Sequence, residues 1–195
     1  PRTRRAVERA IAELGFVPNQ QARVLTGASS NVIGLVVLDV ESPFYMEAAH
    51  AIERAVRESG HVVMLCNSEG ELTREASLLT MLAAQRVRGV LLAPASTYDD
   101  TDRYTDIPGD LPMVFLDFDG GPGHCSISVD NVAGGRLAVQ HLLDLGHSQI
   151  AFVGGPAGLR QFAQRARGAR EAITEAGLDP ETALLEVAVS GIGIQ

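Results

Sequence analysis

The spacing of apolar positions along this chain changes near residue 30. Residues 3–14 carry apolar side chains at helical spacing, namely Ala6, Val7, Ala10, Ile11 and Leu14. This single stripe predicts an amphipathic helix, and Gly15 and Pro18 indicate where it stops. Asn19 is a suitable N-cap for a second, short helix that ends at Leu25.

After residue 30, short apolar runs alternate with amphipathic segments. The continuous apolar run at 32–38 is typical of a strand that is covered on both faces. Further strands are predicted at 61–66, 87–93, 113–116, 126–129, 150–153 and 184–189. Helices are predicted at 43–59, 72–84, 131–145 and 159–176. Repeated β-α units predict an α/β fold with a doubly wound, mostly parallel sheet and right-handed crossovers.

In sheets of this kind, ligands bind beyond the carboxyl ends of the strands. The rule selects the loops at 39–45, 67–71, 94–98, 117–123, 130–131 and 154–165. In the first of them, Phe44 and Tyr45 are adjacent and cannot both face the same core. We expect one of these rings at the strand end, where it could stack on a ligand; the alternative is that both pack beneath the next loop.

Three further side chains are candidates for binding chemistry. Asp130 precedes a predicted helix and suits its N-cap, and it could also accept a hydrogen bond from a hydroxylated ligand. Arg165 and Arg167 offer planar forks of donors that suit hydroxyl groups or a carboxylate. A surface ion pair is the commoner role of a single arginine, so this alternative stays open for both.

Composition and motifs exclude several classes of function. The chain is 46% hydrophobic, its apolar runs are only as long as strands, and no membrane span is predicted. Cys66 and Cys125 are too few for a disulfide framework and indicate reduced thiols. The phosphate-loop fingerprints and the nucleophile elbow are missing, and no metal-ligand spacing accompanies His124 and Cys125. We therefore predict no enzyme activity, no cofactor and no metal.

The net charge of −8 conceals an uneven distribution. Residues 1–30 hold five arginines and two glutamates, a local charge of about +3, so the rest of the chain is strongly acidic. Nucleic acid would be attracted to the first segment and repelled by the rest. A solvated, charged helix with no nucleic-acid partner explains the same composition.

Several motifs, taken together, resemble the lactose-repressor/galactose-repressor (LacI/GalR) family of transcription factors. Among them are SPFY at 42–45, DNVAG at 130–134 and GHSQIAFVGGP at 146–156. The remaining matching segments are 3–7, 10–19, 22–25, 33–37 and 165–168. They follow the family's order and cover nearly the whole chain.

The resemblance implies a periplasmic-binding-protein-like fold with two lobes, preceded by a helical DNA-binding head and a hinge helix. It divides the chain into the end of a helix-turn-helix head at 1–18, a hinge helix and linker at 19–29, an N-terminal lobe at 30–145 and part of a C-terminal lobe at 146–195. By the same comparison the family pattern is incomplete at both ends, so we expect operator DNA to be bound only by the full-length protein.

The resemblance also assigns residues to two sites. The hinge positions that would contact the minor groove are Asn19, Ala22, Arg23 and Leu25. Leu25 would wedge between base pairs, and the small Ala22 would allow close approach to the groove floor. The positions that would contact a small-molecule effector between the lobes are Phe44, Tyr45, Asp130 and Arg165.

The predicted function is a cytoplasmic, homodimeric DNA-binding regulator, acting as a repressor whose operator affinity is controlled by an effector, most commonly a sugar in this family. An alternative is a secreted sugar-binding protein that feeds a transporter, which would share the two-lobed fold but has no use for the hinge at 22–25. An α/β enzyme is a third possibility, but no catalytic set is visible in the sequence.

Overall fold

The computed structural model describes residues 2–15, 30–95, 104, 111–118, 124–156 and 159–189. Helix α1 (Arg2–Leu14) confirms the predicted amphipathic helix, and it ends at Gly15, whose φ of +59° is a left-handed conformation that glycine adopts easily. The predicted hinge residues lie outside the described residues, namely Asn19, Ala22, Arg23 and Leu25.

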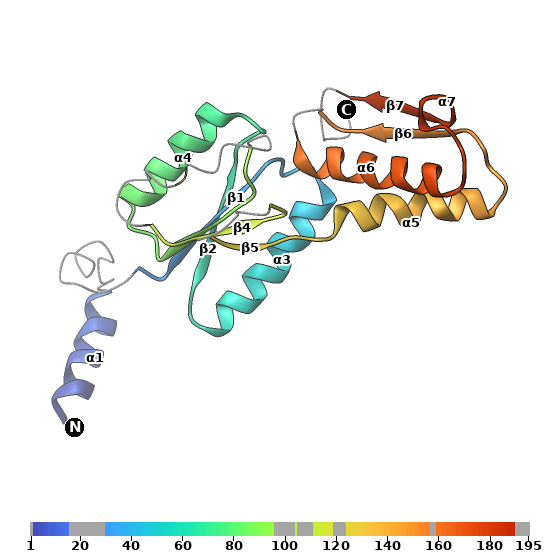
Figure 1. Cartoon of the computed structure of the whole chain (residues 1–195). Helices are drawn as coiled ribbons and strands as arrows, with labels where there is room; N and C mark the ends of the chain where they lie inside the picture. Colours follow the sequence, from blue (N-terminus) through green and yellow to red (C-terminus); the bar gives the residue numbers. More distant parts are fainter. Residues whose placement is uncertain are drawn as a thin grey trace.

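A five-stranded parallel sheet forms the first unit of the fold (Figure 1). Its strands, in chain order, are β1 (Val32–Val37), β2 (Val62–Asn67), β3 (Gly89–Leu92), β4 (Met113–Leu116) and β5 (Cys125–Ile127). Their order across the sheet is β2-β1-β3-β4-β5, and every pair is parallel. The order reverses next to β1, so the carboxyl ends of the strands open into the kind of crevice where ligands bind in such folds.

Helices α3 (Pro43–Glu58) and α4 (Leu72–Ala84) cover opposite faces of this sheet (Figure 1). Alternate residues of β1 divide between two cores: Val36 packs with α4, whereas Leu35 and Val37 pack with α3. All three side chains are at most 1% exposed, as expected for a strand covered on both faces. The doubly wound arrangement predicted from the sequence is therefore confirmed for this unit.

The second unit contains two parallel strands and its own core. It comprises α5 (Asn131–Asp144), β6 (Ile150–Gly154), α6 (Arg160–Glu175), the short α7 (Pro180–Ala183) and β7 (Leu184–Ala188). Val139 of α5 packs with Ile150 of β6, Ile173 of α6 and Leu184 of β7. The short helix α7 was not predicted, because its four residues are too few to show a period.

Helix α5 packs with the elements that follow it in the chain. It lies side by side with α6 and shares the core of the second unit (Figure 1). The boundary between the lobes at residue 145 stays a prediction. An apolar stripe reveals which face of a helix is buried, but it does not reveal which sheet covers that face. No helix within the described ranges is both long and apolar enough to cross a membrane.

Two glycines allow α5 and α6 to approach each other closely. A Cβ atom added to Gly135 would lie 2.0 Å from the carbonyl oxygen of Arg165, and one added to Gly168 would lie 1.9 Å from the carbonyl oxygen of Val132. Both distances are far below van der Waals contact, and both obstacles are backbone atoms, which cannot move aside as the end of a side chain can. Glycine at these positions therefore sets the spacing of the two helices.

We expect Gly135→Ala to destabilise the protein, because the new methyl group must separate α5 from α6. Overpacking of this kind costs about 1–3 kcal/mol. The matched control is Gly134→Ala, since a Cβ at this neighbouring helical position meets nothing within 4 Å. That control should be stabilising by about 0.5–1 kcal/mol, because alanine is the better helix former.

Urea unfolding of the intact protein measures both effects. If Gly135→Ala and Gly134→Ala change the free energy of unfolding equally, the close contact between the helices is not what requires glycine at position 135.

Candidate functional site

A cavity of about 370 Å³ lies where the carboxyl ends of β4 and β5 meet the second unit. The first unit contributes Asp117, Phe118, Ser128, Val129 and Asp130 to its lining. The second unit contributes Asn131, Val132, Arg160, Gln164 and Arg167. The cavity lies beyond the carboxyl ends of the strands, as the rule for doubly wound sheets predicts, but at the β4–β5 edge and not where the strand order reverses beside β1.

A series of hydrogen bonds crosses from the first unit to the second at this cavity. Arg165 Nε of α6 donates to Asn131 Oδ1 at 2.8 Å. Asn131 Nδ2 in turn donates to Asp117 Oδ1 at 3.2 Å and lies 3.4 Å from the carbonyl oxygen of Val129. The first residue of α5 is thus the link between a carboxylate of the first unit and a guanidinium of the second.

Asp117 combines unusual backbone geometry with a perturbed carboxyl group. Its φ of +52° is rare for a residue other than glycine, although aspartate tolerates it better than most. Burial raises the pKa of this carboxyl, while the hydrogen bond from Asn131 and the charge of Arg165 oppose the rise. Non-glycine residues with positive φ are often found at ligand-binding sites.

The two adjacent aromatic residues have different surroundings, as expected. Tyr45 is 5% exposed and belongs to the core between α3 and the sheet, whereas Phe44 is 49% exposed. Burial raises the pKa of the Tyr45 hydroxyl, the nearby charge of Asp117 raises it further, and Arg165 opposes this. Tyr45 therefore lies near the hydrogen-bond series, but neither ring lines the cavity.

Asp130 performs the capping role predicted for it. Its side chain accepts a hydrogen bond from the backbone N–H of Ala133 at 2.9 Å, which satisfies one free donor of the first turn of α5. The same residue is exposed and lines the cavity. One carboxylate oxygen caps the helix, so Asp130 retains acceptor capacity toward the cavity.

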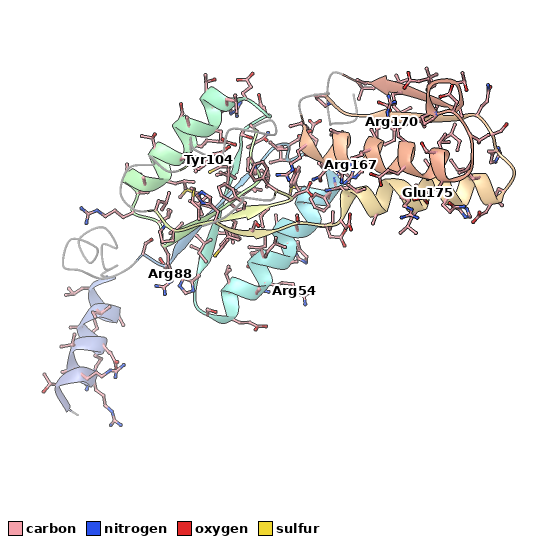
Figure 2. All side chains as sticks on the ribbon, in the orientation of Figure 1. Arg54, Arg88, Tyr104, Arg167, Arg170 and Glu175 are labelled. Carbon is pink, nitrogen blue, oxygen red and sulfur yellow. The ribbon has the colours of Figure 1, made fainter. Side chains whose placement is uncertain are left out.

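The arginines of α6 occupy different surroundings. The Arg160 guanidinium lies 5.4 Å from the centre of the Phe118 ring, and that of Arg165 lies 5.8 Å from the ring of Phe162. Arg167, which Figure 2 labels on the same helix, lines the cavity and approaches Glu171 at 3.4 Å. Arg165 does not line this cavity but borders a second, mostly apolar hollow of about 310 Å³ between α5 and β6.

The cavity offers complementary hydrogen-bonding groups on its two sides. Donors from α6 face it at Arg160, Gln164 and Arg167, while acceptors come from Asp117 and Asp130. Such a lining suits a small ligand with several hydroxyl groups. Within the described residues there is no group of three His, Cys, Asp or Glu side chains that could hold a metal ion.

Of the four predicted effector residues, Asp130 lines the cavity and Arg165 donates to Asn131, which lines it. Phe44 and Tyr45 do not line it. Four residues of the lining were not predicted individually from the sequence, namely Asp117, Phe118, Arg160 and Gln164. Asp117 and Phe118 open the loop that the strand-end rule selects after β4. Arg160 and Gln164 are four residues apart in α6, a spacing that places both on one side of a helix.

Comparison with known proteins gives consistent matches. Residues 30–190 match the profile of a family described as periplasmic binding proteins and sugar binding domain of the LacI family. The ribose operon repressor of Escherichia coli is 34% identical over 174 residues, which are 89% of this chain and 53% of that protein. The HTH-type transcriptional regulator DegA of Bacillus subtilis is 31% identical over 187 residues, covering 94% of this chain and 56% of that protein. This chain thus spans about half the length of the curated relatives that it matches.

A solved structure resembles the fold as well. It is a periplasmic binding protein/LacI transcriptional regulator from Alkaliphilus metalliredigens, complexed with D-xylulofuranose. The TM-score is 0.74 at 26% sequence identity, and the match covers 85% of this chain and 59% of that chain. The architecture is therefore the α/β periplasmic-binding-protein-like fold with parallel sheets.

We expect Asn131→Ala to destabilise the intact protein at neutral pH, because Asp117 loses a donor and Arg165 loses an acceptor. Losing one hydrogen-bond partner of a buried group costs about 1–3 kcal/mol, and the low end applies to this partly buried pair. Burial already raises the pKa of Asp117, and loss of the Asn131 bond should raise it further. A protein whose carboxyl has a higher pKa in the folded state gains stability as the pH falls through that pKa. The loss of unfolding free energy in Asn131→Ala, relative to the wild type, should therefore become smaller in mild acid.

Thermal unfolding of the wild type and the variant, from neutral to mildly acidic pH, measures this deficit. In the Asp117→Asn background the pH dependence caused by this carboxyl should vanish. A deficit that stays constant with pH in both backgrounds would show that Asn131 does not act on Asp117.

Proposed function

Because this chain belongs to the family of periplasmic binding proteins and LacI-type sugar-binding domains, we propose that it is the effector-binding part of a transcriptional regulator. The regulator binds operator DNA, and a small molecule held between the two units changes its affinity for that DNA. The relatives named above, a ribose operon repressor and an HTH-type transcriptional regulator, support a regulator over a transport protein. As a regulator of this family, the protein is not an enzyme.

The proposed effector site is the cavity at the junction of the units. The observation that carries it is the hydrogen-bond series Arg165–Asn131–Asp117, which joins the second unit to the first beside the cavity. A ligand that adds bonds to these groups favours one arrangement of the units over another, which is what effector control requires. Asp130 lines the cavity and is exposed, so its carboxylate can contact such a ligand. Phe44 and Tyr45 do not line the cavity, and their predicted contact with the effector stays a proposal.

We propose a sugar as the class of effector. The donors and acceptors that line the cavity match the hydroxyl groups of a sugar, and its volume of about 370 Å³ lies within the usual range for small-molecule sites. Two of the similar proteins also support a sugar. One is a ribose operon repressor, and the other is a regulator whose structure was solved in complex with D-xylulofuranose.

We expect at least one sugar in a panel of D-ribose, D-xylulose, D-fructose and cellobiose to raise the melting temperature of the intact protein. A ligand at a hundred times its Kd stabilises the folded state by about 2.7 kcal/mol. Arg165→Ala should abolish the shift, because it removes the guanidinium that orients Asn131. The matched control is Arg170→Ala, since Arg170 lies on the same helix but pairs with Glu181 and Glu186 away from the cavity (Figure 2).

Isothermal titration calorimetry of the same variants then gives the affinities. If Arg165→Ala binds the sugar as tightly as the wild type does, Arg165 is not part of the effector site. If no sugar in the panel changes the melting temperature, the sugar class is wrong.

We further propose that Asn19, Ala22, Arg23 and Leu25 form a hinge helix that enters the minor groove of the operator. The exposed basic side chains of α1, among them Arg5 and Arg9, would add sequence-independent attraction to the phosphates. Wedging Leu25 between base pairs costs a few kcal/mol of unstacking, which is offset by the additional surface contacted on bent DNA. Effector binding then alters operator affinity, typically by roughly 5- to 150-fold in coupled systems.

We expect Leu25→Ala in the full-length protein to weaken operator binding by roughly tenfold or more, equivalent to about 1.4 kcal/mol. Sugar binding should be unchanged. Fluorescence anisotropy with the promoter DNA of the protein's own operon measures the operator affinity, and calorimetry measures the sugar affinity. The matched control is Leu145→Ala, because Leu145 is 63% exposed at the end of α5.

The outcome also separates the regulator from a transport protein. A full-length wild type with no operator affinity but tight sugar binding would favour a sugar-binding component of a transporter. Equal losses of operator and sugar affinity in Leu25→Ala would contradict the wedge.

The regulator is proposed to act as a homodimer in the cytoplasm, where operator DNA is found. Among the described strands, β2 lies at an edge of the sheet and exposes Val62, Met64 and Leu65. An apolar edge strand tends to associate with another chain. A two-fold interface uses the same patch on both copies, so the β2 edge is one surface that supports this assembly.

A further inference from the structure

A buried carboxylate on α4 holds together segments that are distant in sequence. Glu75 is 2% exposed. Its Oε2 accepts a hydrogen bond from the backbone N–H of Ala95 at 2.6 Å, and its Oε1 accepts one from the Tyr104 hydroxyl at 2.8 Å. A carboxylate is costly to bury unless such bonds replace water. Glu75 therefore fixes both the backbone that follows β3 and the position of the Tyr104 ring, which Figure 2 shows beside α4.

A continuous series of aromatic contacts leads from Tyr104 to the cavity. The Tyr104 ring meets Phe115 edge to face with 5.1 Å between centroids, and Phe115 lies 5.5 Å from Phe118. Phe118 lines the cavity, with the Arg160 guanidinium 5.4 Å from its centre. Each of these three rings is at most 4% exposed, so none can move without disturbing its neighbour.

The position of the cavity wall therefore depends on how Phe115 is packed. Phe115 is fully buried on β4, two residues before Asp117, so its ring and the backbone of the site belong to one short segment. On the other side, Phe115 also contacts His124, which leads into β5, at 5.3 Å between ring centroids. A shift of Tyr104 would reach both strands whose ends form the cavity.

We propose that Glu75 is a positioning residue for the effector site, acting through Tyr104, Phe115 and Phe118 although it does not line the cavity. The proposal rests on the function proposed for the cavity. It makes Glu75 and Tyr104 determinants of effector affinity although neither of them lines the cavity.

The test compares two substitutions of Glu75. Glu75→Met keeps the length of the side chain but removes both acceptors, whereas Glu75→Gln keeps one acceptor and places a donor near the Tyr104 hydroxyl, which can accept. Hydrogen exchange of the intact protein, followed by mass spectrometry, should show faster exchange at 113–118 in Glu75→Met and near-normal exchange in Glu75→Gln. This readout needs no ligand.

The second readout is the Kd for D-ribose and the other sugars of the panel, measured where every variant is folded. Glu75→Met should raise the Kd by roughly two- to thirtyfold, the range seen for residues that act on a site at a distance. Tyr104→Phe removes one hydroxyl and keeps the ring, so it gives a smaller rise and replaces Glu75→Met if that variant does not fold. Glu71→Met is the control, because Glu71 is exposed at the start of α4 and its side chain makes no capping bond.

A lower melting temperature with unchanged exchange at 113–118 and unchanged Kd would overturn the proposal and leave Glu75 a purely structural residue. If no sugar binds any variant, the proposed effector class fails, while the exchange data still decide whether Glu75 positions the cavity wall.

Discussion

The close contact between α5 and α6 is the constraint on which the site depends. Gly135 and Gly168 bring each helix against backbone carbonyl oxygens of the other, at a spacing that any larger residue would prevent. That spacing puts Asn131, the first residue of α5, within 2.8 Å of Arg165 on α6. Because α5 begins directly after the segment that leaves β5, the same contact fixes where the second unit lies relative to the strand ends of the first.

The polar link at this junction is suited to change. Asp117 is only partly buried, and its partner Asn131 satisfies part of its bonding capacity at a moderate 3.2 Å. A bond of that length between partly solvated groups contributes little net free energy, so a ligand with well-placed hydroxyl groups can compete for it. The apolar cores on either side cannot be altered by a ligand in this way, because they are tightly packed and move as units. A weak polar contact between two rigid cores is a natural place for a small molecule to alter their relation.

Much of this arrangement could be predicted from the sequence, and the exceptions have physical causes. Helix 72–84 and strand 113–116 match the prediction, as do the left-handed stop at Gly15 and the cap at Asp130. These features depend on neighbours in the chain. The sequence did not indicate which elements α5 packs against, because its buried face meets β6, β7 and α6, which all come later in the chain. The buried position of Glu75 was not predicted, since its partner Tyr104 is 29 residues away.

Both cases have the same cause: a sequence pattern indicates how much of a side chain is buried far better than it indicates which neighbours bury it. For the function, the identity of the neighbours matters more than the degree of burial. Asp117 and Glu75 are both acidic, yet one lies at a cavity beside an arginine and the other lies inside the core of the sheet. Their partners, Asn131 and Tyr104, decide the difference, because a carboxylate with a tight pair of donors is a fixed structural anchor, whereas one with spare acceptor capacity can bind a ligand. The same chemistry thus supports the wall of the site at one position and forms its binding surface at another.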